Sequence, residues 1–339
     1  MLVKRPTISD IAEAAGVSIG AVSFALNDRP GVSARTRERI RAIADELGWQ
    51  PNAAARNLSA ARAEAVGLVI ARDAATLGVE PFYMKFIAGL ETELSATGTA
   101  LVLQVVGGHE RAIEALRTLW AGRRIDATIL TDLWVDDMRV AALSRLGLPG
   151  VLVGHPSVRP PGATIPAVWS DDAAALSEAV GYLAGIGHRR IARVGGLVSL
   201  SHTRIRTAAF RAAADRHGLA AAEVVDTDYT WEAGAWATER LLTAADPPTA
   251  VLFDNDIMAT AGLHVARKLG VDVPGRLSIV AGDDSQLCEM AFPALSALAR
   301  DIHAYGAHAA RMLLSGSAED FQDATPRLLL RDSIAPPPH

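Results

Sequence analysis

The stretch "TISDIAEAAGVSIGAVSFALN", residues 7–27, contains two short helical patterns separated by one turn. Thr7 stands three residues before Asp10, which is the spacing of a capping box at a helix start. The apolar residues that follow share one helical face: Ile8, Ile11, Ala12 and Ala15. Ser18 can cap a second helix directly after the turn at Gly16. The stretch therefore predicts a helix-turn-helix.

A third helix is predicted in "SARTRERIRAIADELGW", residues 33–49, with its start at Ser33 and its C-terminal stop at Gly48. Its inward residues are expected to be Ile40, Ile43, Ala44 and Leu47. Three short helices make one small domain, which we expect to span residues 1–50. A unit of this kind binds DNA by laying its second helix in the major groove, with Ile19, Gly20 and Phe24 pointing outward.

The distribution of charge supports the same interpretation. Residues 1–62 contain nine Lys or Arg and six Asp or Glu, a net charge of +3. The rest of the chain has a net charge of −8, which gives the total of −5. A basic head on an acidic body suggests that the head alone meets a polyanion. A solvated helix face with scattered arginines would give the same count.

Residues 51–63 link the head to the body and predict a helix of about two turns. A helix this short is marginal in water on its own, so we expect it to form only when something stabilises it. Leu58 is the one large apolar side chain in "NAAARNLSAARA" and suits wedging between base steps in the minor groove. A linker leucine that packs on the body is the alternative.

The first 65 residues resemble the LacI/GalR (lactose repressor/galactose repressor) family of bacterial transcriptional regulators. The resemblance is carried by "TISDIAEAAGVS", "VSFALN", "GVSARTRERI" and "LGWQPNAAARNL" in this order and spacing. It implies a recognition helix at Ser18 to Leu26, a hinge helix at residues 51–59 with Leu58 as the minor-groove lever, and binding as a homodimer to near-palindromic operators. The DNA-binding residues that it implies are Thr7, Ser18, Ile19, Gly20, Ser23, Phe24, Asn27, Thr36, Asn52, Ala55, Arg56 and Leu58.

The predicted recognition helix departs from the family in one respect. Phe24 stands where many members have an arginine, and Gly20 and Ala21 offer no side-chain hydrogen bond to a base. Phe24 can contact a thymine methyl group, while Ser23, Thr36 and nearby arginines hold phosphates. Specificity is then expected to depend also on half-site spacing and on the deformability of the step that Leu58 opens.

The body from about residue 64 alternates strand and helix patterns. Apolar runs typical of buried parallel strands, such as "AVGLVIA" and "TALVLQVV", alternate with helical segments such as "ERAIEALRTLWAG". A second set begins after the Pro- and Gly-rich segment 156–166. We predict two doubly wound α/β subdomains over residues 64–339, with ligands beyond the carboxyl ends of the strands.

The body resembles the periplasmic-binding-protein fold, with "VWSDDAAAL", "GIGHRRIARVGG", "FDNDIMATAG" and "VPGRLSIVAGDD" as landmarks. This implies dimerisation through the body and a small-molecule effector, most often a sugar, in the cleft between subdomains. The effector-binding residues that it implies are Phe82, Tyr83, Asp132, Trp134, Arg206, Tyr229, Asn255 and Asp283. Arg206 could instead form a helix-surface ion pair, the aromatic residues could pack in the core, and either Asn255 or Asp256 could be only a helix N-cap.

Two further departures bear on the ligand. Gly282 replaces the aromatic residue that usually precedes the aspartate, and Ala299-Arg300 occupies the usual Arg-Gln. We therefore expect a roomier and more cationic pocket, and Arg206 with Arg300 raises the hypothesis of an acidic sugar or a sugar phosphate.

Other classes of protein find no support in the motifs. The chain has no Gly-x-Ser-x-Gly elbow, P-loop or His-Glu-x-x-His pattern, so we predict no catalytic residues, metal site or cofactor. The single Cys288, the lack of an apolar segment after the N-terminal cations and the lack of a membrane-spanning run predict a cytoplasmic protein.

We expect a repressor of carbohydrate uptake or catabolism genes, whose ligand acts either as an inducer or as a co-repressor. A cytoplasmic sugar-binding module without DNA function is the alternative.

Overall fold

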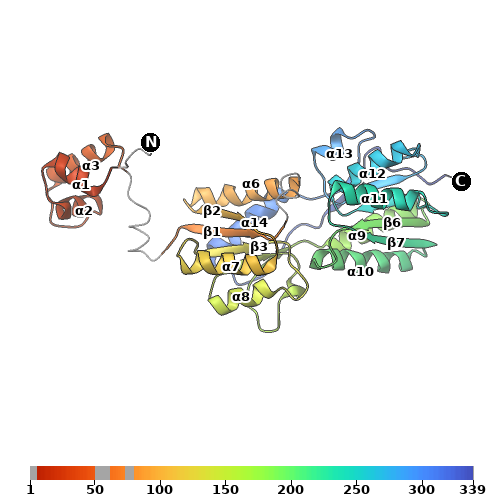
Figure 1. Cartoon of the computed structure of the whole chain (residues 1–339), viewed down its shortest axis with the longest axis horizontal. Coiled ribbons are helices and arrows are strands. Elements are labelled where there is room, and N and C mark those ends of the chain that lie inside the picture. The colour runs from red at the N-terminus through yellow and green to blue at the C-terminus, as the bar shows by residue number, and fades with distance from the viewer. Residues whose placement is uncertain (1–5, 50–61, 73–79, 339) are drawn as a thin grey trace. The chain divides into compact units, whose positions relative to one another are not determined.

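The structure is a computed structural model that describes residues 6–49, 62–72 and 80–338. The chain divides into two compact units, Met1–Arg62 and Ala63–His339, which Figure 1 shows with their elements labelled. The predicted hinge residues Asn52, Ala55, Arg56 and Leu58 lie outside the described residues.

The first unit is the predicted three-helix domain, with α1 at Ile8–Ala15, α2 at Ile19–Leu26 and α3 at Ala34–Glu46. Each helix begins at a hydroxyl side chain that accepts a backbone N–H, namely Thr7, Ser18 and Ser33. Thr7 and Asp10 form the capping box. Gly16 ends α1 in the left-handed conformation, with φ +63°, which turns the chain directly into α2.

A small core holds these helices together. Its buried members are Ile11, Ala12, Ala15, Val22, Ala25, Ile40 and Ala44. Leu47, which the pattern placed inward, is 39% exposed, because α3 has already ended at Glu46 and Leu47 is its C-cap. The expectation for Leu47 is therefore wrong, whereas those for Ile11 and Ile40 are confirmed.

The second unit begins with a six-stranded sheet in the order β11-β5-β4-β3-β1-β2. Its strands pair in parallel, with Ala65 of β1 opposite Ala100 of β2. The strands are β1 (Ala65–Ile70), β2 (Ala100–Val105), β3 (Ala127–Leu130), β4 (Gly150–Val153), β5 (Ala167–Trp169) and β11 (Phe321–Gln322). Helices α6 (Pro81–Ala96) and α14 (Ile302–Ser315) cover one face, and α7 (His109–Ala121) and α8 (Met138–Leu146) cover the other (Figure 1).

The second sheet repeats this plan in the order β12-β10-β9-β8-β6-β7, with only β12 antiparallel. Its strands are β6 (Arg190–Gly195), β7 (Ala221–Asp226), β8 (Ala250–Phe253), β9 (Ser278–Ala281), β10 (Ser296–Ala299) and β12 (Arg327–Leu329). Helices α9 (Asp172–Gly185) and α10 (Ser201–Arg216) cover one face, and α11 (Trp231–Leu242) and α12 (Asp256–Lys268) cover the other. The short α13 (Gln286–Met290) follows β9. The predicted pair of doubly wound subdomains is confirmed.

The chain crosses between the two subdomains three times, after β5, after β10 and after β11. Helix α14 and strand β11 thereby return to the first subdomain, although they lie late in the sequence. The crossings place Ser170 to Asp172 and Arg300 between the two sheets. Side chains from widely separated parts of the sequence therefore meet at the junction.

Helices α6 and α14 approach each other closely through two glycines. A Cβ on Gly89 would lie 2.0 Å from the backbone oxygen of His303, and a Cβ on Gly306 would lie 2.2 Å from that of Phe86. Both positions therefore have no room for a side chain unless the helices separate.

No single helix within the described ranges is long and apolar enough to cross a membrane. Among the described helices, only α1 and α2 taken together pass that test of length and composition, and they are bent by 106° at the turn between them.

Candidate functional site

Helix α2 presents the outward side chains that the sequence predicts for base contact. Ile19 is 55% exposed and Phe24 is 40% exposed, and Gly20 beside Ile19 is also exposed. The Phe24 ring packs against the loop after α2, where a Cβ on Gly31 would lie 3.1 Å from it. The exposed surface of α2 therefore has two apolar side chains and no charged one.

Among the described polar residues predicted to contact DNA, the side chains of Thr7, Ser18, Asn27 and Thr36 form local hydrogen bonds. Thr7 and Ser18 cap their helices, and the Thr36 and Ser33 hydroxyl oxygens lie 2.8 Å apart. Asn27 donates its side-chain amide to the Ser23 carbonyl over 2.9 Å. The hydroxyl of Ser18 accepts from the backbone, which leaves its proton able to donate to a phosphate.

Two arginines of α3 anchor the loop after α2. Arg37 and Arg41 each donate to Oδ1 of Asp28 over 2.7 Å, and the hydrogen bond from Arg37 is the main reason that the pKa of Asp28 is lowered. Arg37 also donates to the Arg29 carbonyl. Part of the positive charge of this unit therefore shapes the loop that supports Phe24.

The second unit holds a cavity of about 360 Å³ between the carboxyl ends of its two sheets. This volume lies within the roughly 300–1,000 Å³ of small-molecule sites. Every parallel strand except β2, β6 and β11 is followed within three residues by a residue that lines the cavity. The polar and aromatic residues include Arg72, Glu80, Phe82, Tyr83, Asp132, His155, Trp169, Ser170, Asp172, His202, Arg206, Tyr229, Asp254, Asp283, Arg300 and Tyr305.

Asp132 is the centre of one polar network in this cavity. Arg72 donates two hydrogen bonds to it, 2.7 Å from Nε to Oδ2 and 3.1 Å from Nη2 to Oδ1. The Tyr83 hydroxyl also donates to Oδ2. Burial opposes ionisation of Asp132, but the Arg72 guanidinium outweighs it and lowers the pKa of the carboxyl. Arg72 also lies 4.9 Å from the centre of the Tyr229 ring, which belongs to the other subdomain.

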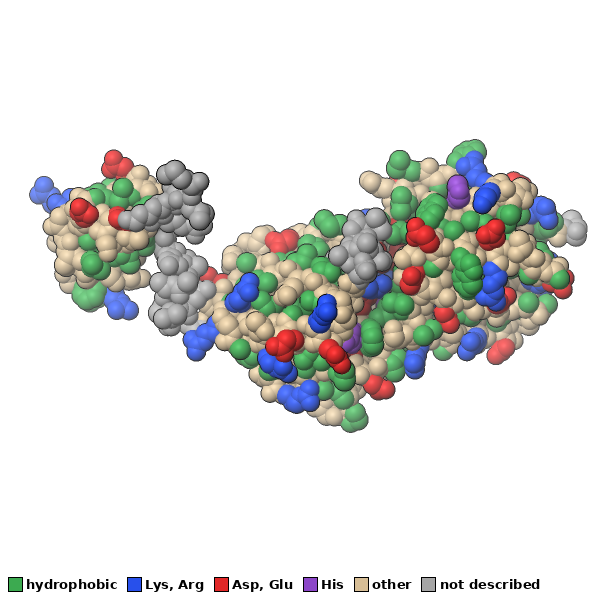
Figure 2. Space-filling view, viewed as in Figure 1, with side chains coloured by type: hydrophobic (Ala, Val, Ile, Leu, Met, Phe, Trp, Pro, Cys, Tyr) green, Lys and Arg blue, Asp and Glu red, His purple; other side chains and the backbone are tan. Residues whose placement is uncertain are grey.

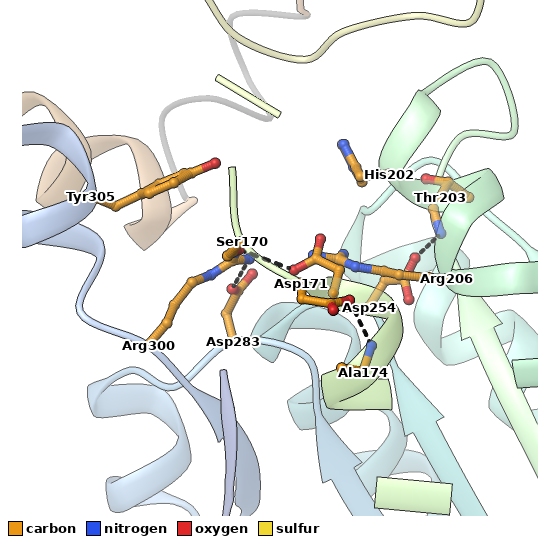
Figure 3. Close-up of polar contacts among 12 residues, drawn as sticks. Ser170, Asp171, Ala174, His202, Thr203, Arg206, Asp254, Asp283, Arg300 and Tyr305 are labelled. Atoms are coloured by element: carbon orange, nitrogen blue, oxygen red, sulfur yellow. Dashed lines mark hydrogen bonds and ion pairs between the residues drawn. The ribbon is translucent and has the colours of Figure 1, made fainter. Parts of the chain in front are cut away.

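Asp172 is the centre of a second network at the crossings between the subdomains. Arg206 donates to its Oδ2 over 2.9 Å, and Arg300 lies 3.4 Å from its Oδ1. Arg300 also reaches the Ser170 hydroxyl at 3.2 Å and Asp283 at 3.0 Å, as Figure 3 shows. Burial favours the neutral acid, yet the two guanidiniums lower the pKa of Asp172 to about 2.

These pairings change the expected charge of the pocket. Arg206 and Arg300 do not add free positive charge, because Asp172 and Asp283 compensate them. The expectation of a more cationic pocket is therefore wrong. Outside the cavity, Figure 2 likewise shows acidic and basic side chains interspersed over the viewed face of this unit.

Gly282 does not enlarge the cavity either. A Cβ added to Gly282 would lie 2.4 Å from the backbone oxygen of Asp254, and Gly282 does not line the main cavity. The glycine instead allows the ends of β8 and β9 to approach each other. The expectation of a roomier pocket at this position is wrong for that reason.

The Asp254 carboxylate is paired with an arginine inside the second sheet. Arg193, fully buried in β6, donates to its two oxygens over 2.9 and 2.6 Å, and the Gly196 N–H donates to it over 3.0 Å. A charged side chain inside an apolar strand requires a partner. Arg193 in "RIARVGG" is therefore the signal by which this pair could have been found in the sequence.

Tyr229 closes the cavity on the side of the second subdomain. Its backbone is left-handed, with φ +72°, and its hydroxyl lies 2.8 Å from Nε2 of His202 and 3.0 Å from Oγ1 of Thr203. Burial, with help from nearby Arg206, lowers the pKa of His202 to about 4. The imidazole is consequently neutral at pH 7, so it offers a ligand no positive charge.

Six of the eight predicted effector residues line the cavity: Phe82, Tyr83, Asp132, Arg206, Tyr229 and Asp283. Trp134 does not; its ring centre lies 3.7 Å from that of His109, and its backbone pairs with Leu200 of the other subdomain. Asn255 is the N-cap of α12, accepting from the Met258 N–H, and it donates to the Tyr229 carbonyl over 3.1 Å. Asn255 therefore holds the backbone of Tyr229 and does not itself line the cavity.

The prediction did not include several residues that line the cavity. Arg72, Asp172 and Asp254 stand within three residues of strand ends, which is where a doubly wound sheet binds ligands, and His202 lies in the first turn of α10. Position after a strand could have indicated them, but their partners depend on the strand order. Within the described part of the chain, no group of three or more His, Cys, Asp and Glu could hold a metal ion.

Comparisons with known proteins agree with this architecture. Residues 7–52 match the bacterial regulatory proteins of the lacI family, and residues 180–334 match the periplasmic binding protein-like domain. The HTH-type transcriptional regulator CelR of Thermobifida fusca is 33% identical over 92% of each chain. Catabolite control protein A of Priestia megaterium is 30% identical over 91% of each chain.

Solved structures give the same result. A lac repressor dimer bound to operator and the anti-inducer ONPF matches with a TM-score of 0.85 and 25% identity, over 98% of this chain and all of that one. A CelR–cellobiose complex matches with a TM-score of 0.72 and 30% identity, over 97% of this chain and all of that one. A helix-turn-helix unit joined to a two-subdomain cavity defines a DNA-binding transcriptional regulator. The chain belongs to the LacI family of bacterial regulatory proteins.

Proposed function

We propose that this regulator acts in the cytoplasm as a homodimeric repressor of carbohydrate uptake or catabolism genes, and that an uncharged, polyhydroxylated ligand controls it. Residues 1–50 would contact a near-palindromic operator, residues 51–63 would form the hinge, and residues 64–339 would bind ligand and dimerise. We assign no catalytic reaction to the cavity.

The pairing of charges in the cavity carries the proposal for the ligand. Among the described residues that line the cavity, each of the three arginines, Arg72, Arg206 and Arg300, already contacts a carboxylate. A phosphate or carboxylate on the ligand would add negative charge beside carboxylates that already balance these arginines, whereas hydroxyl groups can bind to the paired charges as donors and acceptors. Phe82, Trp169 and Tyr305 add aromatic surface for an apolar sugar face. The CelR–cellobiose complex supports the same class of ligand.

Control of DNA binding follows from ligand contacts on both subdomains. Arg72 and Asp132 belong to the first, whereas Arg206 and Tyr229 belong to the second. A ligand that binds better to one relative orientation of the subdomains shifts the population toward it. The coupling between ligand and operator is expected to be about 1–3 kcal/mol and must be reciprocal.

Selection from a random double-stranded DNA pool at physiological salt tests the proposal. We expect a near-palindromic consensus, whose recovery changes with one of four neutral disaccharides (cellobiose, maltose, lactose or sucrose). Glucose 6-phosphate and glucuronate serve as charged controls and should have no effect. A response to the acidic compounds alone would contradict the proposed ligand class, and a lack of any enriched sequence would contradict operator binding.

Recognition of thymine methyl groups gives a second prediction. Ile19 and Phe24 provide apolar surface on α2, so replacing a contacted thymine by uracil, which lacks only the methyl group, should weaken operator binding about fourfold. Fluorescence anisotropy with a single substitution at each half-site thymine measures this. Uracil outside the half-sites is the control. If uracil weakens binding of the double variant (Ile19→Ala with Phe24→Ala) as much as it weakens binding of the wild type, these two side chains do not recognise the methyl group.

A further inference from the structure

Glu80 occupies an unusual position at the edge of the effector cavity. It is the N-cap residue of α6, directly before Pro81, yet its side chain makes no capping hydrogen bond. The helix dipole favours a negative charge at this position, where a shorter aspartate would accept backbone N–H groups of the first turn. The Glu80 side chain instead lines the cavity, and the residue is only 9% exposed.

One oxygen of the Glu80 carboxyl group has no protein partner. Oε2 is buried and forms no hydrogen bond with any residue that the structure describes. The neighbouring guanidinium of Arg72 is held by both oxygens of Asp132, so it forms no ion pair with Glu80. Buried polar atoms are almost always hydrogen-bonded, and one left alone at a cavity wall is a site where a ligand atom can bind.

The surroundings of Glu80 favour its neutral acid. Burial is the main cause that raises its pKa, to about 8; Arg72 opposes this, and Asp132, Asp283 and Asp256 add to it. These groups come from the ends of β1, β3 and β9 and from α12. Tyr83 on α6 itself is also buried and remains neutral, because its own pKa is raised. A neutral carboxyl group has one O–H donor and one free acceptor, which matches a hydroxyl group.

We propose that Glu80 is a specificity-determining residue of the effector site, whose carboxylic acid exchanges hydrogen bonds with one hydroxyl group of an uncharged ligand. The inference rests on the proposed function of the cavity. It adds a residue that neither the predicted set nor the charge-paired networks contain, and it excludes a ligand with a negative group at this end of the cavity.

Isothermal titration calorimetry tests the proposal. The ligand is cellobiose, or another of the four disaccharides if that one binds the wild-type chain. Glu80→Gln has the shape and the donor and acceptor of the neutral acid, so its affinity at pH 7 should stay within about threefold of wild type. Glu80→Ala leaves the ligand hydroxyl unpaired and should bind about tenfold more weakly. Glu91→Gln, on the same helix but away from the cavity, is the matched control. Retained operator binding and circular dichroism establish that each variant is folded.

The dependence of affinity on pH separates recognition by the neutral acid from recognition by a carboxylate. A bound ligand excludes the remaining water and further disfavours the charged form, so wild-type affinity should fall between pH 7 and pH 9. The affinity of Glu80→Gln should stay constant over this range. Affinity that rises with pH, a Glu80→Gln variant as weak as Glu80→Ala, or a Glu80→Ala variant equal to wild type would overturn the proposal. If none of the four disaccharides binds the wild-type chain, both this proposal and the proposed ligand class fail.

Thermal unfolding of the ligand-free protein gives an independent measurement. The pKa of Glu80 is raised from its ordinary value of 4.5 to about 8 on folding, so its contribution to stability is complete below pH 4.5 and is lost as the pH rises through 8. Glu80→Gln does not undergo this loss. Its melting temperature should therefore rise relative to wild type between pH 5 and pH 8.5, and a constant difference would contradict a buried neutral acid.

Discussion

Replacing Arg206 by alanine is expected to abolish the response of operator binding to the ligand while leaving operator binding itself intact. Arg206 donates to Asp172 at the crossing between the subdomains, and both side chains line the cavity. Removing a charged hydrogen-bond donor from the cavity leaves a polar group of the ligand unpaired and costs on the order of 1.5–3 kcal/mol, so ligand affinity should fall about 10- to 100-fold. The helix-turn-helix unit is compact on its own and contains none of these residues.

The experiment measures operator affinity by anisotropy with and without the neutral disaccharide that binds the wild-type chain. Arg211→Ala is the matched control, because Arg211 lies on the same helix and is exposed outside the cavity. It should respond as wild type does. An Arg206→Ala variant with an unchanged ligand response would reduce Arg206 to a structural ion pair, which is the alternative that the sequence left open.

Replacing Gly306 by alanine is expected to destabilise the second unit strongly. The new Cβ would lie 2.2 Å from the Phe86 carbonyl oxygen, a backbone atom that cannot move aside by rotating a side chain. Overpacking commonly costs about 1–3 kcal/mol, and a contact with backbone belongs at the upper end, because α6 and α14 must separate. The melting temperature should fall by on the order of 5–10 °C.

Circular dichroism during heating measures this effect. Gly185→Ala is the control, since Gly185 is also helical but has no heavy atom within 4 Å of its Cβ position. It should leave the melting temperature unchanged or raise it slightly, because alanine is the better helix former. If Gly306→Ala melts at the wild-type temperature, the packing of α6 and α14 tolerates a side chain there.

Local chemistry made most of the fold predictable. Thr7, Ser18 and Ser33 begin their helices as expected, because capping involves residues only three positions apart. The alternation of buried strands and helices likewise indicated two doubly wound subdomains. Leu47 marks the limit of this reasoning, since the periodicity continues past the point where the helix ends.

The candidate site was less predictable because it is assembled at strand ends. Trp134 stands after β3, but its backbone pairs with Leu200 and its ring lies against His109, outside the cavity. Asn255 caps a helix behind Tyr229. Residues that follow a strand are therefore candidates, and only the packing of the loops selects those whose side chains enter the cavity.

The sequence by itself determined the helix-turn-helix, the family, the α/β body and the edge of the sheets where a ligand binds, because each depends on patterns within a few dozen residues. The tertiary structure alone decided the charge of the site. Arg72 and Asp132 are 60 residues apart and Arg300 and Asp172 are 128 apart, and they meet only through the strand order and the three crossings. Compensation of a buried charge depends on distance in space, which local sequence patterns do not specify.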